Sequence, residues 1–439
     1  MIKLIKSLFG ILVLFVAYYT SSAQVPSYYS MNALGLPINS NNVRSISMGG
    51  VYNSLIDPFR VNYNNPASYA EFLLTNFDIS GSFIANSIAN NNTAGSLSAA
   101  NLNAISIGFP IKPNKIGLAV GLQPYSYMNY NAFNKEPIGG TNVDVGMKGY
   151  GSYSTAFIGL GFRIIDNLLI GFNFNYLFGK IEKSRYLYFS APHLYNSKTF
   201  IDIDASGMFF NYGLSYIFNI NEKDKILLSY SSDVGSKINT TEDLISGSYI
   251  NVNNNEVIID SVSSVINNHN SFILPFKHTL GVMYEADKYL RFGADFSLQD
   301  WSNIKYKPFD EIASGLVFLK DQQLSSSYRL SLGAEYIPNV KSPNKYYQKI
   351  EYRLGVKLEK LNINVNSNSV NAVSFNAGLG LPIDRQLFST VLHNISYLNI
   401  GLGITRQGSI SKNLVQETYF NLYIGFNIAN KWFIQRKYD

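Results

Sequence analysis

The sequence predicts an all-β protein, a transmembrane antiparallel β-barrel of about fourteen strands with an N-terminal hatch or plug segment. Three observations lead to this prediction. Large apolar residues alternate with small or charged residues along most of the chain after residue 75. Charged residues make up only 15% of the chain and aromatic residues 14%, whereas about 25% of residues are charged in an ordinary soluble domain. Short and long links alternate between the patterned segments, which is typical of outer-membrane barrels.

The N-terminus carries the pattern of a secretory signal peptide. Lys3 and Lys6 precede an apolar run at 7–19, and the small residues Ser22 and Ala23 predict cleavage before Gln24. The apolar run is shorter than the roughly 20 residues that a spanning helix needs. We therefore expect export to the outer membrane of a Gram-negative bacterium. The expected parts are a signal peptide at 1–23, an N-terminal hatch or plug at 24–74 and the barrel at 75–439.

The alternation defines the expected strands. In the last of them Phe420, Leu422 and Ile424 share one face, and the residues between them share the other. Short links such as 220–224 predict periplasmic turns, and long links such as 237–272 predict external loops. The expected strands are 75–85, 102–109, 115–126, 146–162, 168–185, 200–219, 225–236, 273–285, 289–301, 324–337, 344–357, 370–383, 392–406 and 416–434.

Two motifs stand in the segment before the first strand. The first runs from Arg44 through Met48, Gly49 and Gly50, and the second is Asn65-Pro66-Ala67. Glycines permit a tight approach of backbone to the barrel wall. Proline cannot donate to a sheet ladder, so Pro66 indicates a turn ahead of the first strand. Both features favour a plug, which either gates transport or has no transport role.

These motifs resemble the hatch of the long-chain fatty-acid transporter (FadL-type) family of outer-membrane barrels. That family has a similar Arg…Met-Gly-Gly stretch, with Ala usual where Val51 stands here, followed by Asn-Pro-Ala. The resemblance continues in segments such as 274–281 and 419–427. It implies a barrel with a hatch in the lumen. Related barrels with the same signature include the shuttle component of type IX secretion and accessory barrels of assembly complexes.

The expected third strand contains Gln123, Pro124 and Tyr125. Pro124 deletes one ladder hydrogen bond within an alternating run. In FadL-type barrels an inward kink of the third strand opens the wall to the lipid, and the resemblance implies that these three residues mark that kink. The alternative is that Pro124 only ends the strand at the outer rim.

Charged residues occupy the inward positions of neighbouring expected strands. Charges that faced lipid would be costly, so these side chains are expected in the lumen. They form either a network of paired charges that braces the barrel or a site at which an Arg or Lys receives a substrate carboxylate. The residues are Arg291, Asp295, Arg329, Glu335, Glu351, Arg353 and Lys357.

Several function classes are excluded by composition. The chain has no cysteine and four scattered histidines, so no metal site and no cofactor are expected. No catalytic motif or phosphate-binding loop appears, so the protein is not expected to be an enzyme. The net charge of +6 is dispersed, which argues against nucleic acid as a partner.

Two functions remain. The leading hypothesis is a channel for passive uptake of hydrophobic, fatty-acid-like molecules, which would pass a hatched lumen and leave through the wall near Pro124. The alternative is a non-transporting barrel subunit of an outer-membrane protein-assembly or type IX secretion complex. The expected partners are outer-membrane lipid and either a hydrophobic small molecule or a larger outer-membrane machine. A continuous apolar conduit would favour the channel, and a sealed lumen with an exposed apolar patch would favour the subunit.

Overall fold

The structure is a computed structural model of the chain. It describes residues 26–31, 34–38, 42–90, 94–138, 141–189, 194–252, 255–287, 289–302, 322–339, 345–365, 367–383, 394–412 and 414–432. The predicted signal peptide, 1–23, lies outside the described residues.

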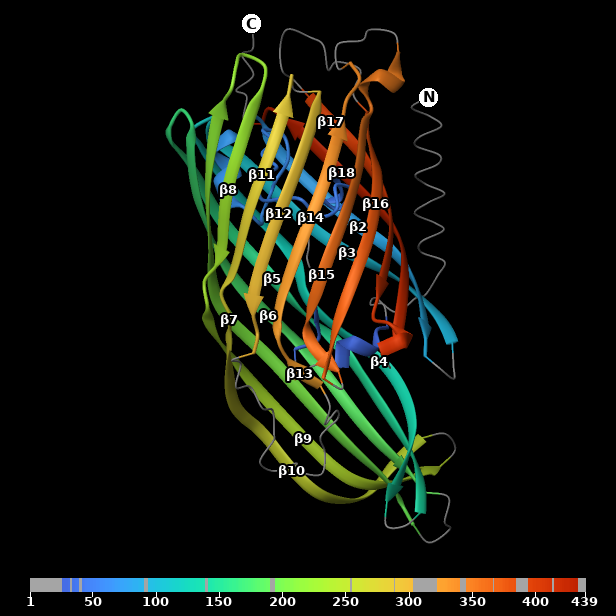
Figure 1. Ribbon diagram of the computed structural model, residues 1–439. Coiled ribbons are helices and arrows are strands. Elements are labelled where there is room, and N and C mark those ends of the chain that lie inside the picture. The colour runs from blue at the N-terminus through green and yellow to red at the C-terminus, as the bar shows by residue number, and fades with distance from the viewer. Residues whose placement is uncertain are drawn as a thin grey trace, which may run out of the picture.

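Among the described residues, fourteen antiparallel strands form a closed ring (Figure 1). Each pairs with the next in the sequence order of the ring, and β18 pairs with β2 to close it. This confirms the predicted fold class. The ring strands are β2 (Thr75–Ala89), β3 (Ala94–Lys112), β4 (Ile116–Ile138), β5 (Thr141–Ile165), β6 (Leu168–Tyr188), β7 (Asn196–Asn219), β8 (Lys225–Asp233), β11 (Lys277–Ala286), β12 (Leu290–Asp300), β14 (Ser326–Tyr336), β15 (Glu351–Val365), β16 (Asn368–Pro382), β17 (Asn394–Gln407) and β18 (Gln416–Asn430).

The wall extends beyond the ring on the side of the long links. Strands β9 (Ser236–Val252) and β10 (Asn255–Leu274) form a hairpin between β8 and β11, and β9 pairs with the far half of β7. The short β13 (Gln322–Leu324) pairs with β15. The link 237–272 was expected to be a loop, and this expectation was wrong. Strand that projects beyond the bilayer need not present an apolar face to lipid, so the alternation that identifies a spanning strand is absent there.

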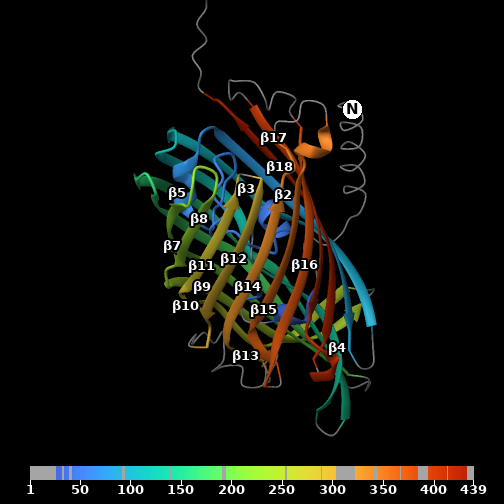
Figure 2. The same ribbon diagram turned by 45° about the horizontal axis from the view of Figure 1, so that its top comes forward.

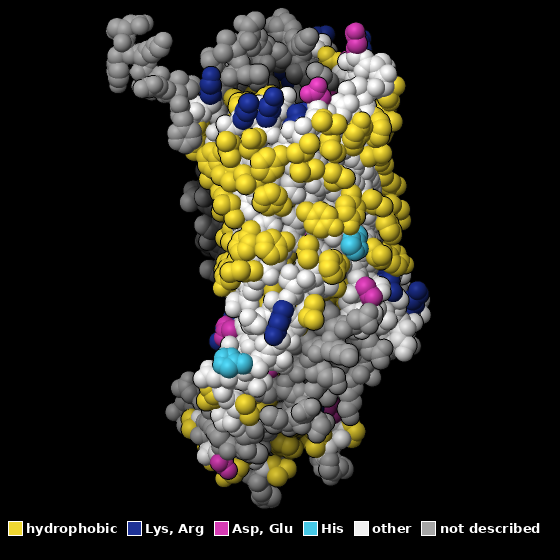
Figure 3. All heavy atoms as spheres, turned by 90° about the vertical axis from the view of Figure 1, so that its left-hand side faces the viewer, with side chains coloured by type: hydrophobic (Ala, Val, Ile, Leu, Met, Phe, Trp, Pro, Cys, Tyr) yellow, Lys and Arg dark blue, Asp and Glu magenta, His cyan; other side chains and the backbone are white. Residues whose placement is uncertain are grey.

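The two faces of the wall differ in chemistry as the alternation predicts. On β12, Phe292 and Phe296 are about half exposed, whereas Asp295 between them is buried. Figure 3 shows the result on one face of the barrel as an apolar band. The described helices include none that is long and apolar enough to cross a membrane.

The described residues before the first ring strand, 26–31, 34–38 and 42–74, lie inside the barrel, where strands surround them in two views (Figures 1 and 2). We call this segment the hatch. Its short elements contact opposite parts of the wall: α2 contacts β15 to β18, and η2 contacts β3 to β7. The hatch elements are η1 (Tyr28–Met31), β1 (Leu36–Pro37), α2 (Val43–Ser47) and η2 (Pro66–Glu71), and the wall links carry η3 (Tyr346–Lys349) and η4 (Ile410–Lys412).

Candidate functional site

The Met48-Gly49-Gly50 turn lies directly against the wall. Asn42 caps α2 by accepting a hydrogen bond from the Ser45 N–H at 2.9 Å. After α2 the chain turns through Gly49, at φ +71°, a conformation that favours glycine. A Cβ on Gly49 would lie 2.6 Å from the backbone nitrogen and oxygen of Val356 on β15. The second wall strand in contact, β14, offers Gly333 to the Met48 backbone. Glycines on both sides therefore bring two backbones together.

The Asn65-Pro66-Ala67 motif docks on the opposite wall. The Asn65 side chain accepts from the Ala67 N–H at 3.2 Å and donates to Asn53 O at 2.6 Å and Ser215 Oγ at 3.0 Å. The Pro66 carbonyl packs where Gly171 of β6 leaves room. This motif therefore links two hatch segments to β6 and β7.

A buried ion cluster joins the hatch to the wall, and Glu335 on β14 is its centre. Its carboxylate meets Arg44 of the hatch at 2.6 and 2.7 Å. The same carboxylate meets Arg353 of β15 at 2.8 Å and Arg291 of β12 at 2.5 Å. The side chain of Glu335 is fully buried and that of Arg44 nearly so, so these charges are held by one another and not by water.

The cluster continues through residues that sequence reasoning did not select. Arg60 of the hatch meets Glu351 at 2.7 Å and Asp57 at 3.1 Å, and Asp57 also contacts Arg44. Glu351 contacts Arg353 as well. Arg60 and Asp57 lie in irregular chain, where no periodicity indicates which way a side chain points. Glu285 on β11, which pairs with Arg291 at 2.8 Å, sits at an alternating position that could have identified it.

Electrostatics keep the hatch carboxylate ionised. Burial raises the pKa of Asp57, but the neighbouring guanidinium groups of Arg44 and Arg60 outweigh it, so this pKa lies below its usual range. Ionised Asp57 therefore balances, within the hatch, the same two guanidinium groups that pair with the wall carboxylates Glu335 and Glu351.

The other predicted lumen charges lie apart from this cluster. Asp295 accepts hydrogen bonds from the backbone N–H groups of Tyr52 at 2.6 Å and Asn53 at 2.7 Å, which fixes a second hatch turn. Arg329 lies over the Tyr52 ring, 5.8 Å from its centroid. Lys357 pairs with Glu359 at 2.9 Å.

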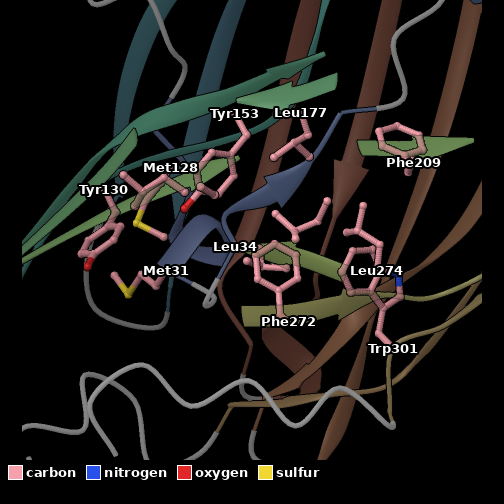
Figure 4. Close-up of a cluster of buried hydrophobic side chains, with 13 residues drawn as sticks. Met31, Leu34, Met128, Tyr130, Tyr153, Leu177, Phe209, Phe272, Leu274 and Trp301 are labelled. Atoms are coloured by element: carbon pink, nitrogen blue, oxygen red, sulfur yellow. The ribbon is translucent and has the colours of Figure 1, made fainter. Parts of the chain in front are cut away.

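Apolar packing holds the hatch at the other end of the lumen. Met31 and Leu34 of the hatch lie among large side chains from the extended parts of the wall (Figure 4). Nearby, Glu417 of β18 accepts hydrogen bonds from Ser27 Oγ at 2.9 Å and the Tyr28 N–H at 2.7 Å. The wall residues of this cluster are Met128, Tyr130, Tyr153, Leu177, Ile181, Ala205, Phe209, Ile238, Phe272, Leu274 and Trp301.

The predicted kink lies where two wall strands part. The β3–β4 register ends at Ile105↔Leu122 in the described residues, whereas β4 continues to Ile138 and stays paired with β5. Pro124 therefore does not end the strand. A register shift in the β4–β5 ladder follows Pro124, and the carbonyl of Tyr125 accepts from the hatch Ile38 N–H at 2.8 Å.

A cavity of about 400 Å³ lies between this parting and the hatch. Gln123 and Pro124 line it from the wall, and Gly49 and Gly50 line it from the hatch. Its apolar lining includes Ile38, Ile46, Ile84, Leu102 and Leu122, and its polar lining includes Arg329, Lys357, Ser374, Asn376 and Thr405. Tyr125 packs on Phe209 instead, with ring centroids 6.2 Å apart. The described residues contain no cluster of acidic and histidine side chains suited to a metal ion.

The closed barrel and its internal hatch define an outer-membrane barrel with a FadL-like fold. Solved structures of the same fold include a Pseudomonas aeruginosa FadL homologue (12% identity, TM-score 0.54, 91% of this chain and 100% of that one). Another is the P. putida toluene transporter TodX, with 12% identity and a TM-score of 0.55, which covers 90% of this chain and 100% of that one. A third is the CymD monoaromatic hydrocarbon channel, with 13% identity and a TM-score of 0.52, which covers 91% of this chain and 99% of that one. At such low identity, these likenesses concern the fold alone.

The BamG family model matches residues 1–439, the whole chain, and the protein belongs to the BamG family. The resemblance seen in the hatch motifs is thereby confirmed, including its branch of accessory barrels. A comparison with curated proteins found no match.

Proposed function

We propose that this protein is a non-transporting barrel subunit of an outer-membrane protein-assembly machine. It would act in the outer membrane of a Gram-negative bacterium after removal of residues 1–23. The observation that carries the proposal is the match of the BamG family over the whole chain, because the name of that family refers to the barrel-assembly (Bam) machinery. The partner is accordingly a larger outer-membrane complex, and no catalytic step is involved.

The attachment of the hatch supports a structural role. Moving the hatch would separate Arg44 from Glu335 and Arg60 from Glu351, all of which are buried. Breaking one buried ion pair costs about 3–5 kcal/mol. At the far end the apolar contacts of Met31 and Leu34 would also be lost. A passive channel has no energy source to offset these costs. A subunit that binds its partner through its outer surface does not have to move the hatch, so these costs do not arise.

A second function is favoured by one observation. The end of the β3–β4 register beside the cavity is the arrangement that a lateral exit would need. Two of the similar structures are described as a toluene transporter and a monoaromatic hydrocarbon channel. Uptake of a hydrophobic small molecule therefore remains the second candidate.

Depletion in the native host distinguishes the two functions. We expect depletion to lower the amounts of other outer-membrane barrels at least twofold, measured by quantitative mass spectrometry of the outer membrane. We also expect a tagged copy, purified in mild detergent, to carry an assembly barrel at a fixed stoichiometry. Re-expression of the wild-type chain is the control.

Unchanged levels of other barrels together with slower uptake of an aromatic hydrocarbon or fatty acid would replace the assembly proposal with the channel. Purification of the barrel alone, with a bound apolar molecule in place of a protein partner, would have the same meaning.

A further inference from the structure

The outer face of the wall between β7 and β14 carries a groove of about 500 Å³. Strand register explains its position. One ladder row crosses the face through Leu280 and Phe296, and the next crosses it through Val282 and Ala294. Ala294 has the smallest side chain of its row, so the surface is hollow there. The two rows are Leu214, Tyr230, Leu280, Phe296, Leu330 and Tyr216, Leu228, Val282, Ala294, Leu332.

A polar cluster adjoins the groove on the side of the long links. His278 Nδ1 lies 2.8 Å from the Tyr230 hydroxyl and 3.2 Å from Ser232 Oγ. Both contacts use the same ring nitrogen, and no hydrogen bond to Nε2 is found within the part of the chain that the structure describes. Tyr230 also lines the groove. The polar cluster and the groove are therefore one continuous surface.

This surface faces lipid. His278 alternates with Phe276 and Leu280, which are 52% and 59% exposed on the outside of the barrel, and Figure 3 shows the apolar band on this side. A polar group that faces a membrane is costly unless it has a partner, and the partners of His278 among the described residues satisfy Nδ1 and not Nε2. Short turns are periplasmic in such barrels, so the His278 end of the groove points toward the outer leaflet surface.

We propose that this surface is a binding site for one outer-leaflet lipid. An acyl chain lies in the groove over Ala294 and Val282, and a phosphate or ester oxygen at its polar end is hydrogen-bonded by the His278 cluster. The His278 cluster lies nearer the membrane surface than the apolar groove, as the head group of a lipid lies nearer the surface than its acyl chains. A neighbouring barrel would instead place its apolar band against both the groove and the His278 cluster, and would offer the cluster no hydrogen-bond partner. The site does not depend on the proposed function.

Two substitutions test the site. Ala294→Phe fills the groove from the outside without entering the lumen, and His278→Leu removes the polar end. Ala334→Phe is the matched control, because Ala334 is also small and lies in the next row, opposite Phe292 and outside the groove lining. Each variant is exchanged into nanodiscs that contain lipid A or phosphatidylethanolamine. Lipid retained per barrel is then counted by native mass spectrometry after release.

We expect the wild type and Ala334→Phe to retain one lipid, and both test variants to retain at least fivefold less. Preference for lipid A over phosphatidylethanolamine, or the reverse, identifies which source supplies the head group. Equal retention by Ala294→Phe and the wild type would overturn the proposal. The proposal would also be overturned if the wild type retained no lipid and Ala294→Phe lost a protein partner from native membranes. Heat-modifiable migration on a gel verifies that every variant is folded.

Discussion

At the scale of single residues, the hatch depends on a few side chains that have no substitute. Glu335 meets three guanidinium groups, those of Arg44, Arg353 and Arg291, with one carboxylate. A buried carboxylate in such a position satisfies several cations at once, so its removal affects more than one pair. Gly49 of the hatch turn is equally restricted, because a Cβ there would meet the Val356 backbone and not the end of a flexible side chain.

Glu335→Gln should loosen the hatch, because it leaves buried guanidinium groups without their shared anion. The expected cost is about 3–5 kcal/mol. Thermal unfolding and protease cleavage of the hatch in detergent measure it. Asp144→Asn is the control: Asp144 pairs with Lys135 at 3.7 Å in an exposed position, and exposed pairs contribute about 0–1 kcal/mol. Equal melting temperatures for the two variants would contradict the role given to the cluster.

Gly49→Ala should destabilise hatch docking by about 1–3 kcal/mol, since the residue has a positive φ and its Cβ would meet the β15 backbone. Gly95→Ala on β3 is the comparison, because a Cβ there meets nothing within 4 Å. Hydrogen exchange of hatch amides reports the difference. Comparable protection in both variants would show that the tight turn is not needed.

The lumen charges could be predicted from the sequence, but their partners could not. The alternation of strands fixes which way Glu335, Arg353 and Arg291 point. Whether an inward charge meets a neighbouring strand, the hatch or water depends on how the hatch folds. Arg60 shows the limit: it completes the cluster through Glu351, yet it lies in chain without periodicity.

At the scale of elements, the fourteen ring strands follow from alternation, whereas their lengths do not. Strand β4 was expected at 115–126 and extends to Ile138, and the hairpin β9–β10 was expected to be a loop. Lipid imposes an apolar face only on the part of a strand that spans the bilayer. The expected strand 344–357 also differs from β15, Glu351–Val365, because η3 occupies its beginning.

The end of the β3–β4 ladder can be tested with cysteine pairs, since the chain has no cysteine of its own. Ile107 and Val120 are partners within the ladder. A disulfide between Ile107→Cys and Val120→Cys should form nearly completely under mild oxidation. If the ladder continued, Asn103 and Pro124 would be directly opposite each other on the same face as Ile107 and Val120. Asn103→Cys with Pro124→Cys should form little disulfide, because the strands have parted there. Similar yields would mean that the wall is continuous.

At the scale of the whole molecule, the two candidate functions differ in what must move. A channel must open the hatch, while an assembly subunit keeps it closed and works through its outer surface. The hatch is held by charges at one side of the lumen and by apolar packing at the other, and the two anchors have different physical origins. A substitution that removes a charge at the first anchor leaves the apolar contacts of Met31 and Leu34 at the second in place.

A covalent staple from the hatch to the wall separates these functions. A Cβ at Gly401 would lie 2.8 Å from Ser47 Oγ, a spacing that suits a disulfide between Ser47→Cys and Gly401→Cys. We expect cells with the oxidised double variant to keep normal levels of other outer-membrane barrels, measured by quantitative mass spectrometry, because an assembly subunit does not open its hatch. Each single variant is the control. If oxidation abolished function and a reductant restored it, hatch movement would be essential, and the protein would act as a channel.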